Sequence, residues 1–183
     1  MIDAEGGVPR QLTPEPSLDA VGTWSHDGKW IYFHSDRSGE SQVWKMPSGG
    51  GPAVQGTRVG GVYAEESWDD GYLYYAKTEN QTAIWRVPVD GGKETEVVAG
   101  PTNQLAWALS RSGIYYATDH GQGRRREYAI QFYDFESGEI TDLYRKDGPF
   151  EHAWLAVSPD EAWVLYGEAP MGTSELMLVE NFR

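Results

Sequence analysis

The 183-residue chain contains no cysteine, which excludes disulfide frameworks, thiolate nucleophiles and cysteine-based zinc sites. Positive charge is also scarce, because 15 Lys and Arg against 28 Asp and Glu give a formal net charge of −13. Proteins that bind nucleic acid or anionic lipid surfaces need clustered basic residues. We therefore expect no nucleic-acid partner for this segment and no membrane attachment.

Long apolar runs are missing too, since none approaches the roughly 20 residues of a membrane helix. The N-terminal residues MIDAEGGVPRQLT lack the charged and apolar regions of a signal peptide, and the compartment stays open. What the chain has in quantity is 8 Trp and 11 Tyr for a core, with 22 Gly and 10 Pro for turns.

A short phrase recurs four times along the chain. The copies are WSHDGKWIYF at 24–33, ESWDDGYLYY at 66–75, LSRSGIYY at 109–116 and VSPDEAWVLY at 157–166. Their serines, Ser25, Ser67, Ser110 and Ser158, are spaced by 42, 43 and 48 residues. A period of this length is typical of one small antiparallel sheet, the blade of a β-propeller.

The apolar runs inside the repeats do not alternate with polar residues. Trp30–Phe33 and Tyr72–Tyr75 are unbroken, as expected for short strands buried on both faces between neighbouring blades. The turns before the runs include Asp27-Gly28 and Asp69-Asp70-Gly71, in which Asp bonds the backbone and Gly supplies the positive φ. No segment has sustained helical periodicity, so we predict an all-β fold.

The predicted architecture is one domain, residues 1–183, forming a β-propeller of about four antiparallel blades. The blades are predicted at approximately 8–51, 52–93, 94–140 and 141–183, and residues 1–7 resemble the tail of a preceding repeat. This offset between the chain ends and the repeats is expected for either a closed four-blade ring, in which the two terminal strands pair, or a fragment of a larger propeller. An incomplete ring would expose apolar flanking faces and permit a homodimer.

The segment WSHDGKWIYFHSDRSGESQVWKMP at 24–47 resembles the repeat of TolB-like (WD-repeat-like) propellers. That repeat has a Trp-Ser-Pro-Asp-Gly turn, an apolar strand and then Ser-Asp-Arg-x-Gly, and His26 stands here in place of its proline. The later copies diverge more, although Ser158-Pro159-Asp160 keeps the turn. The resemblance spans essentially the whole chain and implies the C-terminal part of a larger propeller protein.

Similar propellers serve unrelated functions, so the resemblance leaves several roles open. The first expectation is a non-catalytic interaction or ligand-sensing module. The ending SELMLVENF at 174–182 resembles that of sensor propellers in bacterial transcriptional regulators. The alternatives are the gating propeller of a prolyl-oligopeptidase-like peptidase and a TolB-like scaffold, which would be periplasmic.

Catalytic and metal-binding patterns are not found in the sequence. There is no G-x-S-x-G nucleophile elbow, and His26, His34, His120 and His152 lack the spacing of metal ligands. We predict no enzyme activity, no cofactor and no metal site. Ser35-Asp36-Arg37 is interpreted as structural, with Asp36 accepting backbone N–H groups and Arg37 pairing with a carboxylate or a carbonyl of the neighbouring blade.

The default binding place on a propeller is the mouth of its central channel, where loops from every blade converge. Segments before the inner strands supply this mouth. The predicted binding residues are Asp19, Tyr63, Glu65, Gln104, His152 and Trp154. Their acidic, amide and aromatic side chains suit a protein or peptide partner, or a small polar ligand.

Overall fold

All regular structure in the computed structural model is antiparallel β-strand. The model describes residues 1–77, 83–99, 102–122, 125–148, 155–168 and 175–179, and none of these residues is helical. A helix long and apolar enough to cross a membrane is therefore not found among them. The predicted all-β class is confirmed.

The described strands form four sheets, each a meander in chain order. The first sheet contains β1 (Asp19–Trp24), β2 (Trp30–Ser35), β3 (Gln42–Pro47) and β4 (Val54–Gln55). The second contains β5 (Tyr63–Glu66), β6 (Tyr72–Ala76), β7 (Ile84–Pro88) and β8 (Thr95–Val98). The third contains β9 (Thr102–Leu109), β10 (Gly113–Gln122), β11 (Arg125–Asp134) and β12 (Ile140–Asp147). The fourth contains β13 (Leu155–Val157), β14 (Val164–Glu168) and β15 (Glu175–Val179).

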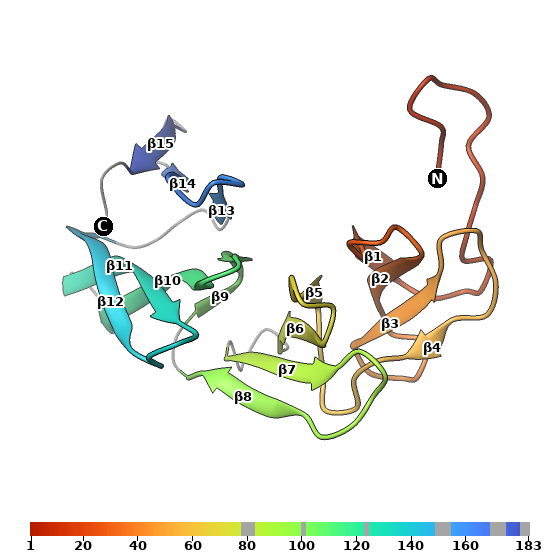
Figure 1. The fold of residues 1–183 in the computed structure, drawn as a ribbon, viewed down its shortest axis with the longest axis horizontal. Coiled ribbons are helices and arrows are strands. Elements are labelled where there is room, and N and C mark those ends of the chain that lie inside the picture. Colours follow the sequence, from red (N-terminus) through yellow and green to blue (C-terminus); the bar gives the residue numbers. More distant parts are fainter. Residues whose placement is uncertain (78–82, 100–101, 123–124, 149–154, 169–174, 180–183) are drawn as a thin grey trace.

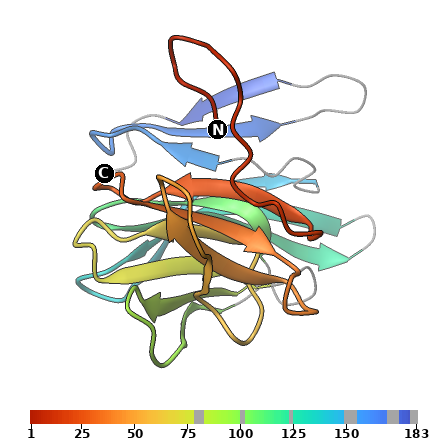
Figure 2. The same ribbon diagram turned by 90° about the vertical axis from the view of Figure 1, so that its right-hand side faces the viewer.

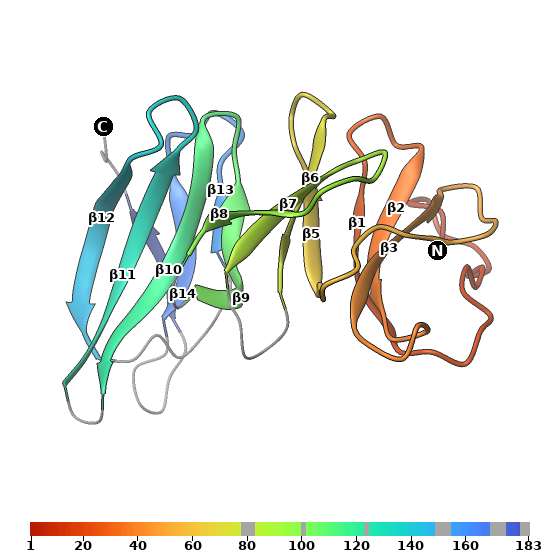
Figure 3. The same cartoon turned by 90° about the horizontal axis from the view of Figure 1, so that it is seen from below.

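The four sheets follow one another along an open arc and do not close into a ring (Figure 1). Their first strands contact each other in succession, β1 with β5, β5 with β9 and β9 with β13. Seen from below, the sheets stand side by side like the blades of a propeller (Figure 3). The described residues are therefore an open array of blades, and the closed four-blade ring, one of the two predicted arrangements, is not formed.

The core is divided among the interfaces between sheets, because neighbouring residues of one strand face opposite ways. Tyr75 packs between the first and second sheets, with Tyr32 and Leu73. Its neighbour Tyr74 packs between the second and third sheets, with Trp107. This confirms that an unbroken apolar run marks a strand buried on both faces.

The repeated serine closes the turn between the first two strands of a sheet. The Ser25 hydroxyl oxygen accepts the Trp30 N–H at 2.9 Å, and the equivalent oxygens of the second and fourth sheets accept likewise at 2.9 and 3.0 Å. Three residues after each serine the backbone is left-handed, at Gly28 (φ 69°), Asp70 (φ 56°) and Glu161 (φ 55°). The expectation of positive φ at Gly71 was therefore wrong, because Asp70 takes that conformation.

The N-terminal segment lies outside the first sheet (Figures 1 and 2) and repeats a turn found elsewhere. The Gly-Gly pair at 6–7 has φ values of 97° and 131°, close to the 87° and 136° of pair 50–51 and the 85° and 148° of pair 91–92. Met1 and Arg10 exchange two backbone hydrogen bonds, at 2.8 and 2.7 Å. This segment therefore forms a short hairpin like the β3–β4 and β7–β8 connections.

Candidate functional site

Asp19 begins β1, the first strand of the arc, but other side chains already bind its carboxylate. Arg37 Nη2 donates to both oxygens, at 3.1 and 3.0 Å, and each of the two side chains is only 14% exposed. Burial opposes ionisation, but hydrogen bonds from Ser35, Thr13, Arg37 and Ser17 outweigh it and lower the pKa of Asp19. The carboxylate therefore fastens the start of β1 to the turn that follows β2.

Arg37 pairs with a carboxylate, one of the two predicted partner types, but Asp19 belongs to the same sheet and not to a neighbouring blade as expected. The guanidinium also lies over the rings of Phe33 and Trp44, 5.1 Å from each centroid. Asp36 accepts a backbone N–H, from Leu18 at 2.9 Å. The Ser-Asp-Arg motif thus holds the chain entering β1 against its own sheet.

Tyr63 and Glu65 form a hydrogen-bonded pair on β5. The Tyr63 hydroxyl donates to Glu65 Oε1 at 2.5 Å, and Glu65 Oε2 accepts the Leu109 N–H of the third sheet at 3.2 Å. Burial around the carboxyl group raises the pKa of Glu65, and burial also raises that of Tyr63. Both predicted binding residues therefore connect the second sheet to the third, where Tyr63 also packs edge-on against Trp107.

The structure says less about the other three predicted binding residues. Gln104 lies within β9, whose backbone is described there although the side chain is not. His152 and Trp154 lie outside the described residues. The channel-mouth site therefore stays a prediction, in which Asp19, Tyr63 and Glu65 already have partners within the protein.

Three residues, from two turns and the end of β5, come close enough to hold a cation, which their positions in the sequence did not suggest. His26 Nδ1 lies 3.4 Å from Asp70 Oδ1 and 4.0 Å from Glu66 Oε2. The Glu66 oxygens already accept the His26 backbone N–H, at 3.0 Å, and the Tyr32 hydroxyl, at 2.9 Å. The cluster therefore works first as a connection between the first and second sheets.

Two hydroxyl groups contact imidazole rings in the described part of the chain. Ser41 Oγ lies 2.9 Å from His34 Nε2, and Thr118 Oγ1 lies 2.9 Å from His120 Nε2. A nucleophile–base pair needs a third group to orient the base. Among the described residues no carboxylate is hydrogen-bonded to either ring, so neither pair forms a catalytic triad.

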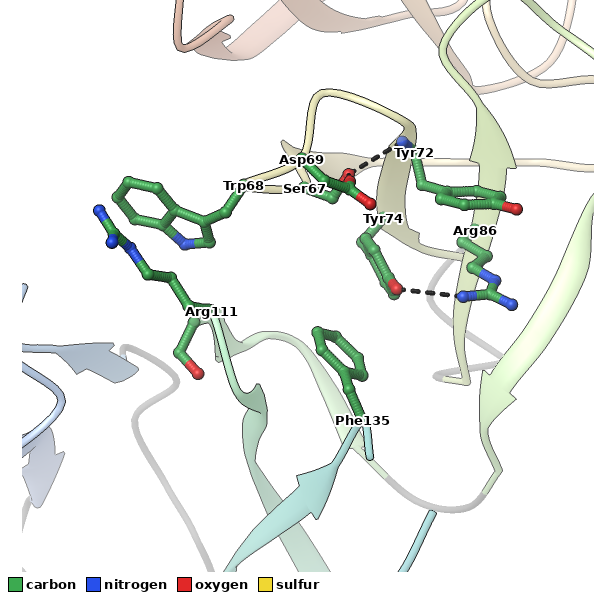
Figure 4. Close-up of a pocket in the computed structure, with 9 residues that line it drawn as sticks. Ser67, Trp68, Asp69, Tyr72, Tyr74, Arg86, Arg111 and Phe135 are labelled. Atoms are coloured by element: carbon green, nitrogen blue, oxygen red, sulfur yellow. Dashed lines mark hydrogen bonds between the residues drawn. The ribbon is translucent and has the colours of Figure 1, made fainter. Parts of the chain in front are cut away.

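A pocket of about 540 Å³ lies between the second and third sheets, at the turns that join their first two strands (Figure 4). Trp68 and Arg111 stand on one side and Tyr72 and Arg86 on the other, and the rings of Tyr74 and Phe135 lie between them, with centroids 5.5 Å apart. We call it the interblade pocket.

The repeat alignment contains a signal for this pocket that sequence reasoning missed. The residue after the repeated serine is His26, Trp68, Arg111 and Pro159 in successive copies. His26 stacks on Trp68 with 4.6 Å between ring centroids, and the Arg111 guanidinium lies 4.6 Å from the Trp68 ring centroid. One repeat position therefore forms a row across three neighbouring turns, and this row borders the pocket.

Comparison with known proteins identifies the family. A family model described as the TolB beta propeller domain matches residues 1–133. The chain belongs to the TolB β-propeller family. An uncharacterized protein of Agrobacterium fabrum is 32% identical over 71 residues, which are 39% of this chain and 20% of that protein.

Two solved structures show how widely this TolB-like fold is shared. Oligogalacturonate lyase of Vibrio parahaemolyticus has a TM-score of 0.69 and 18% identity, covering 88% of this chain and 50% of that one. TolB of Acinetobacter baumannii has a TM-score of 0.63 and 14% identity, covering 98% and 45%. The chain thus spans half or less of these proteins, and at such identities the likeness concerns the fold alone.

Proposed function

We propose that the chain is a non-catalytic binding module whose ligand enters the interblade pocket. The observation that carries this is the pocket itself, because about 540 Å³ lies within the size range of small-molecule sites. Its lining combines aromatic rings with a few polar groups from two sheets, as ligand sites in proteins commonly do. A concavity of this kind favours a small ligand over an extended peptide.

The lining side chains support binding rather than catalysis. General acid–base chemistry works best with a group whose pKa lies near the working pH. The carboxylate in the lining is Asp69, and hydrogen bonds from the Ser67 hydroxyl and the Gly71 N–H lower its pKa. Asp69 therefore stays ionised and engaged in its own turn, where it is poorly suited to move a proton.

Ligand sensing, as in the propeller of a bacterial transcriptional regulator, is the role that this pocket favours. The name of the Vibrio lyase gives oligogalacturonate, an acidic oligosaccharide, as the molecule on which that protein acts. Acidic sugars therefore belong among the compounds tested here.

The test is a ligand-observed NMR screen of small ring compounds, neutral and charged, against the full chain. Trp68→Ala removes one wall of the pocket, and Trp24→Ala is the matched control, since the two indoles are 47% and 54% exposed. Hits should bind the wild type and the control, but not Trp68→Ala. Equal binding of a hit to the wild type and to Trp68→Ala would contradict the proposal. Peptidase or lyase activity that persists through purification would also contradict it.

A further inference from the structure

The cluster of His26, Glu66 and Asp70 brings metal-binding side chains from two sheets together. One ligand atom from each residue lies within 4.8 Å of the other two. His26 follows β1 of the first sheet, whereas Glu66 ends β5 of the second sheet and Asp70 lies in the turn after it. The spacing of the histidines predicted no metal site, because these residues meet only where β1 and β5 contact each other.

The Glu66 carboxylate is largely buried, and the protein supplies little positive charge to it. Its side chain is 7% exposed, and its two hydrogen-bond donors, the His26 N–H and the Tyr32 hydroxyl, are neutral. Among the described Lys and Arg residues, none has a nitrogen within 4.0 Å of its oxygens. The His26 ring, at 4.0 Å, carries a charge only when protonated. Buried charges in proteins are paired or coordinate a metal ion, so a cation is expected beside Glu66.

We infer that this cluster binds a divalent transition-metal ion, and that Zn²⁺ is the ion its ligands suit best. Zn²⁺ binds imidazole nitrogen and carboxylate oxygen at about 2.0–2.2 Å, which puts neighbouring ligands of a tetrahedral site about 3.4 Å apart. The distance from His26 Nδ1 is 3.4 Å to Asp70 Oδ1 and 4.0 Å to Glu66 Oε2. An imidazole ligand also favours Zn²⁺ over Mg²⁺ and Ca²⁺, which prefer oxygen ligands. Three protein ligands leave the fourth position to water.

Neighbouring contacts already orient two of the three ligands. The His26 ring stacks on Trp68, with 4.6 Å between the ring centroids, and the Tyr32 hydroxyl holds Glu66 Oε1 at 2.9 Å. Supporting contacts of this kind fix the direction of metal ligands and raise the affinity of the site. The Asp70 side chain is 64% exposed, and no hydrogen bond to its carboxylate is found within the described structure. Asp70 can therefore move the remaining distance toward an ion without losing a bond.

Isothermal titration of the untagged full chain with Zn²⁺, Mg²⁺ and Ca²⁺ tests the site. One Zn²⁺ should bind per chain, at least about tenfold more tightly than Mg²⁺ or Ca²⁺. His26→Ala and Asp70→Asn each remove one ligand and should weaken Zn²⁺ binding by about tenfold or more. Asn tolerates the left-handed backbone of residue 70 (φ 56°), so this turn should stay intact. The controls are His120→Ala, on β10 of the third sheet, and Asp90→Asn, in an exposed turn, because they remove the same groups outside the cluster.

A gain of affinity gives a second test, and thermal melts show whether each variant is folded. Asp70→His places a second imidazole at a position whose backbone His also tolerates, and it should bind Zn²⁺ at least about tenfold more tightly than Asp70→Asn. Equal Zn²⁺ affinity of His26→Ala and His120→Ala, or of the two Asp70 variants, overturns the inference. A wild type that binds Zn²⁺ no more tightly than Mg²⁺, or not at all, overturns it as well. None of these results bears on the ligand proposed for the interblade pocket.

Discussion

Glu66 connects the first two sheets, and its removal is expected to cost more stability than that of an ordinary surface carboxylate. Its side chain is only 7% exposed, and its two oxygens accept the His26 N–H at 3.0 Å and the Tyr32 hydroxyl at 2.9 Å. Both donors belong to the first sheet, whereas Glu66 ends β5 of the second. In Glu66→Ala, the Tyr32 hydroxyl, on a side chain 2% exposed, loses its acceptor.

The magnitude follows from the two bonds. A hydrogen bond to a charged group contributes about 1.5–3 kcal/mol, and a buried donor left unsatisfied costs a similar amount. The Tyr32 bond should contribute its full value, whereas water partly replaces the bond from the exposed His26. We therefore expect Glu66→Ala to lower the free energy of unfolding by about 3 kcal/mol. For a chain of this length that corresponds to a Tm about 6–12 °C lower.

Urea unfolding followed by tryptophan fluorescence measures this loss, with Glu40→Ala as the control because Glu40 is exposed. Tyr32→Phe removes the same hydrogen bond from the other side. The double variant should therefore fall short of the sum of the single effects by about 1 kcal/mol or more. Additive single effects, or a Glu66→Ala variant within about 0.5 kcal/mol of wild type, would refute the role of Glu66.

Other substitutions isolate single features of the fold. Asp19→Ala should cost about 2–3 kcal/mol, because it removes the main carboxylate partner of the largely buried Arg37 guanidinium and leaves it only Glu15, at 3.8 Å; a loss below about 0.5 kcal/mol in urea would contradict the pairing. Gly113→Ala should cost more than about 3 kcal/mol, because a Cβ there would lie 2.0 Å from the Tyr133 carbonyl oxygen. Gly49→Ala, with nothing within 4 Å, should melt like wild type, and equal melts for both variants would refute the steric argument. The side-chain hydrogen bond from Lys29 is the main cause that lowers the pKa of Asp27, from 3.8 to about 2. The Asp27 carboxylate therefore stabilises the fold above pH 3.8 and loses this effect as the pH falls toward 2. Asp27→Asn should lose less stability across that window in an acid titration, and a loss equal to wild type would contradict the shift.

Local features of the fold were predictable from the sequence because the contacts that form each strand and turn lie within one repeat. The unbroken run around Tyr74 and Tyr75 predicted a strand buried on both faces, and the two rings do lie in different cores. The Ser25 turn was also predictable, since its hydrogen bonds join residues at most five positions apart in the sequence. Even so, which residue takes positive φ was misread in the second repeat, where Asp70 does so instead of Gly71.

The candidate site was less predictable, because its parts are distant in sequence. Trp68, Arg86 and Phe135 come from two sheets and three segments, and no spacing rule connects them. Sequence reasoning selected Asp19 and Glu65 as ligand-binding residues at the channel mouth, but in the structure both carboxylates bind partners within the protein that the pattern did not reveal. Carboxylates at strand starts look alike in sequence, whether a ligand or a neighbouring strand satisfies them.

The sequence by itself determined that the chain repeats one antiparallel sheet, with aromatic strands and serine-closed turns, because hydrogen bonding and burial within a repeat depend on near neighbours. Only the tertiary structure decided that the sheets form an open arc, that Glu66 joins the first sheet to the second, and that turns of the second and third sheets border one pocket. Those outcomes depend on the angle and the distance between neighbouring sheets. Small differences in side-chain packing determine both, and no local sequence pattern predicts them.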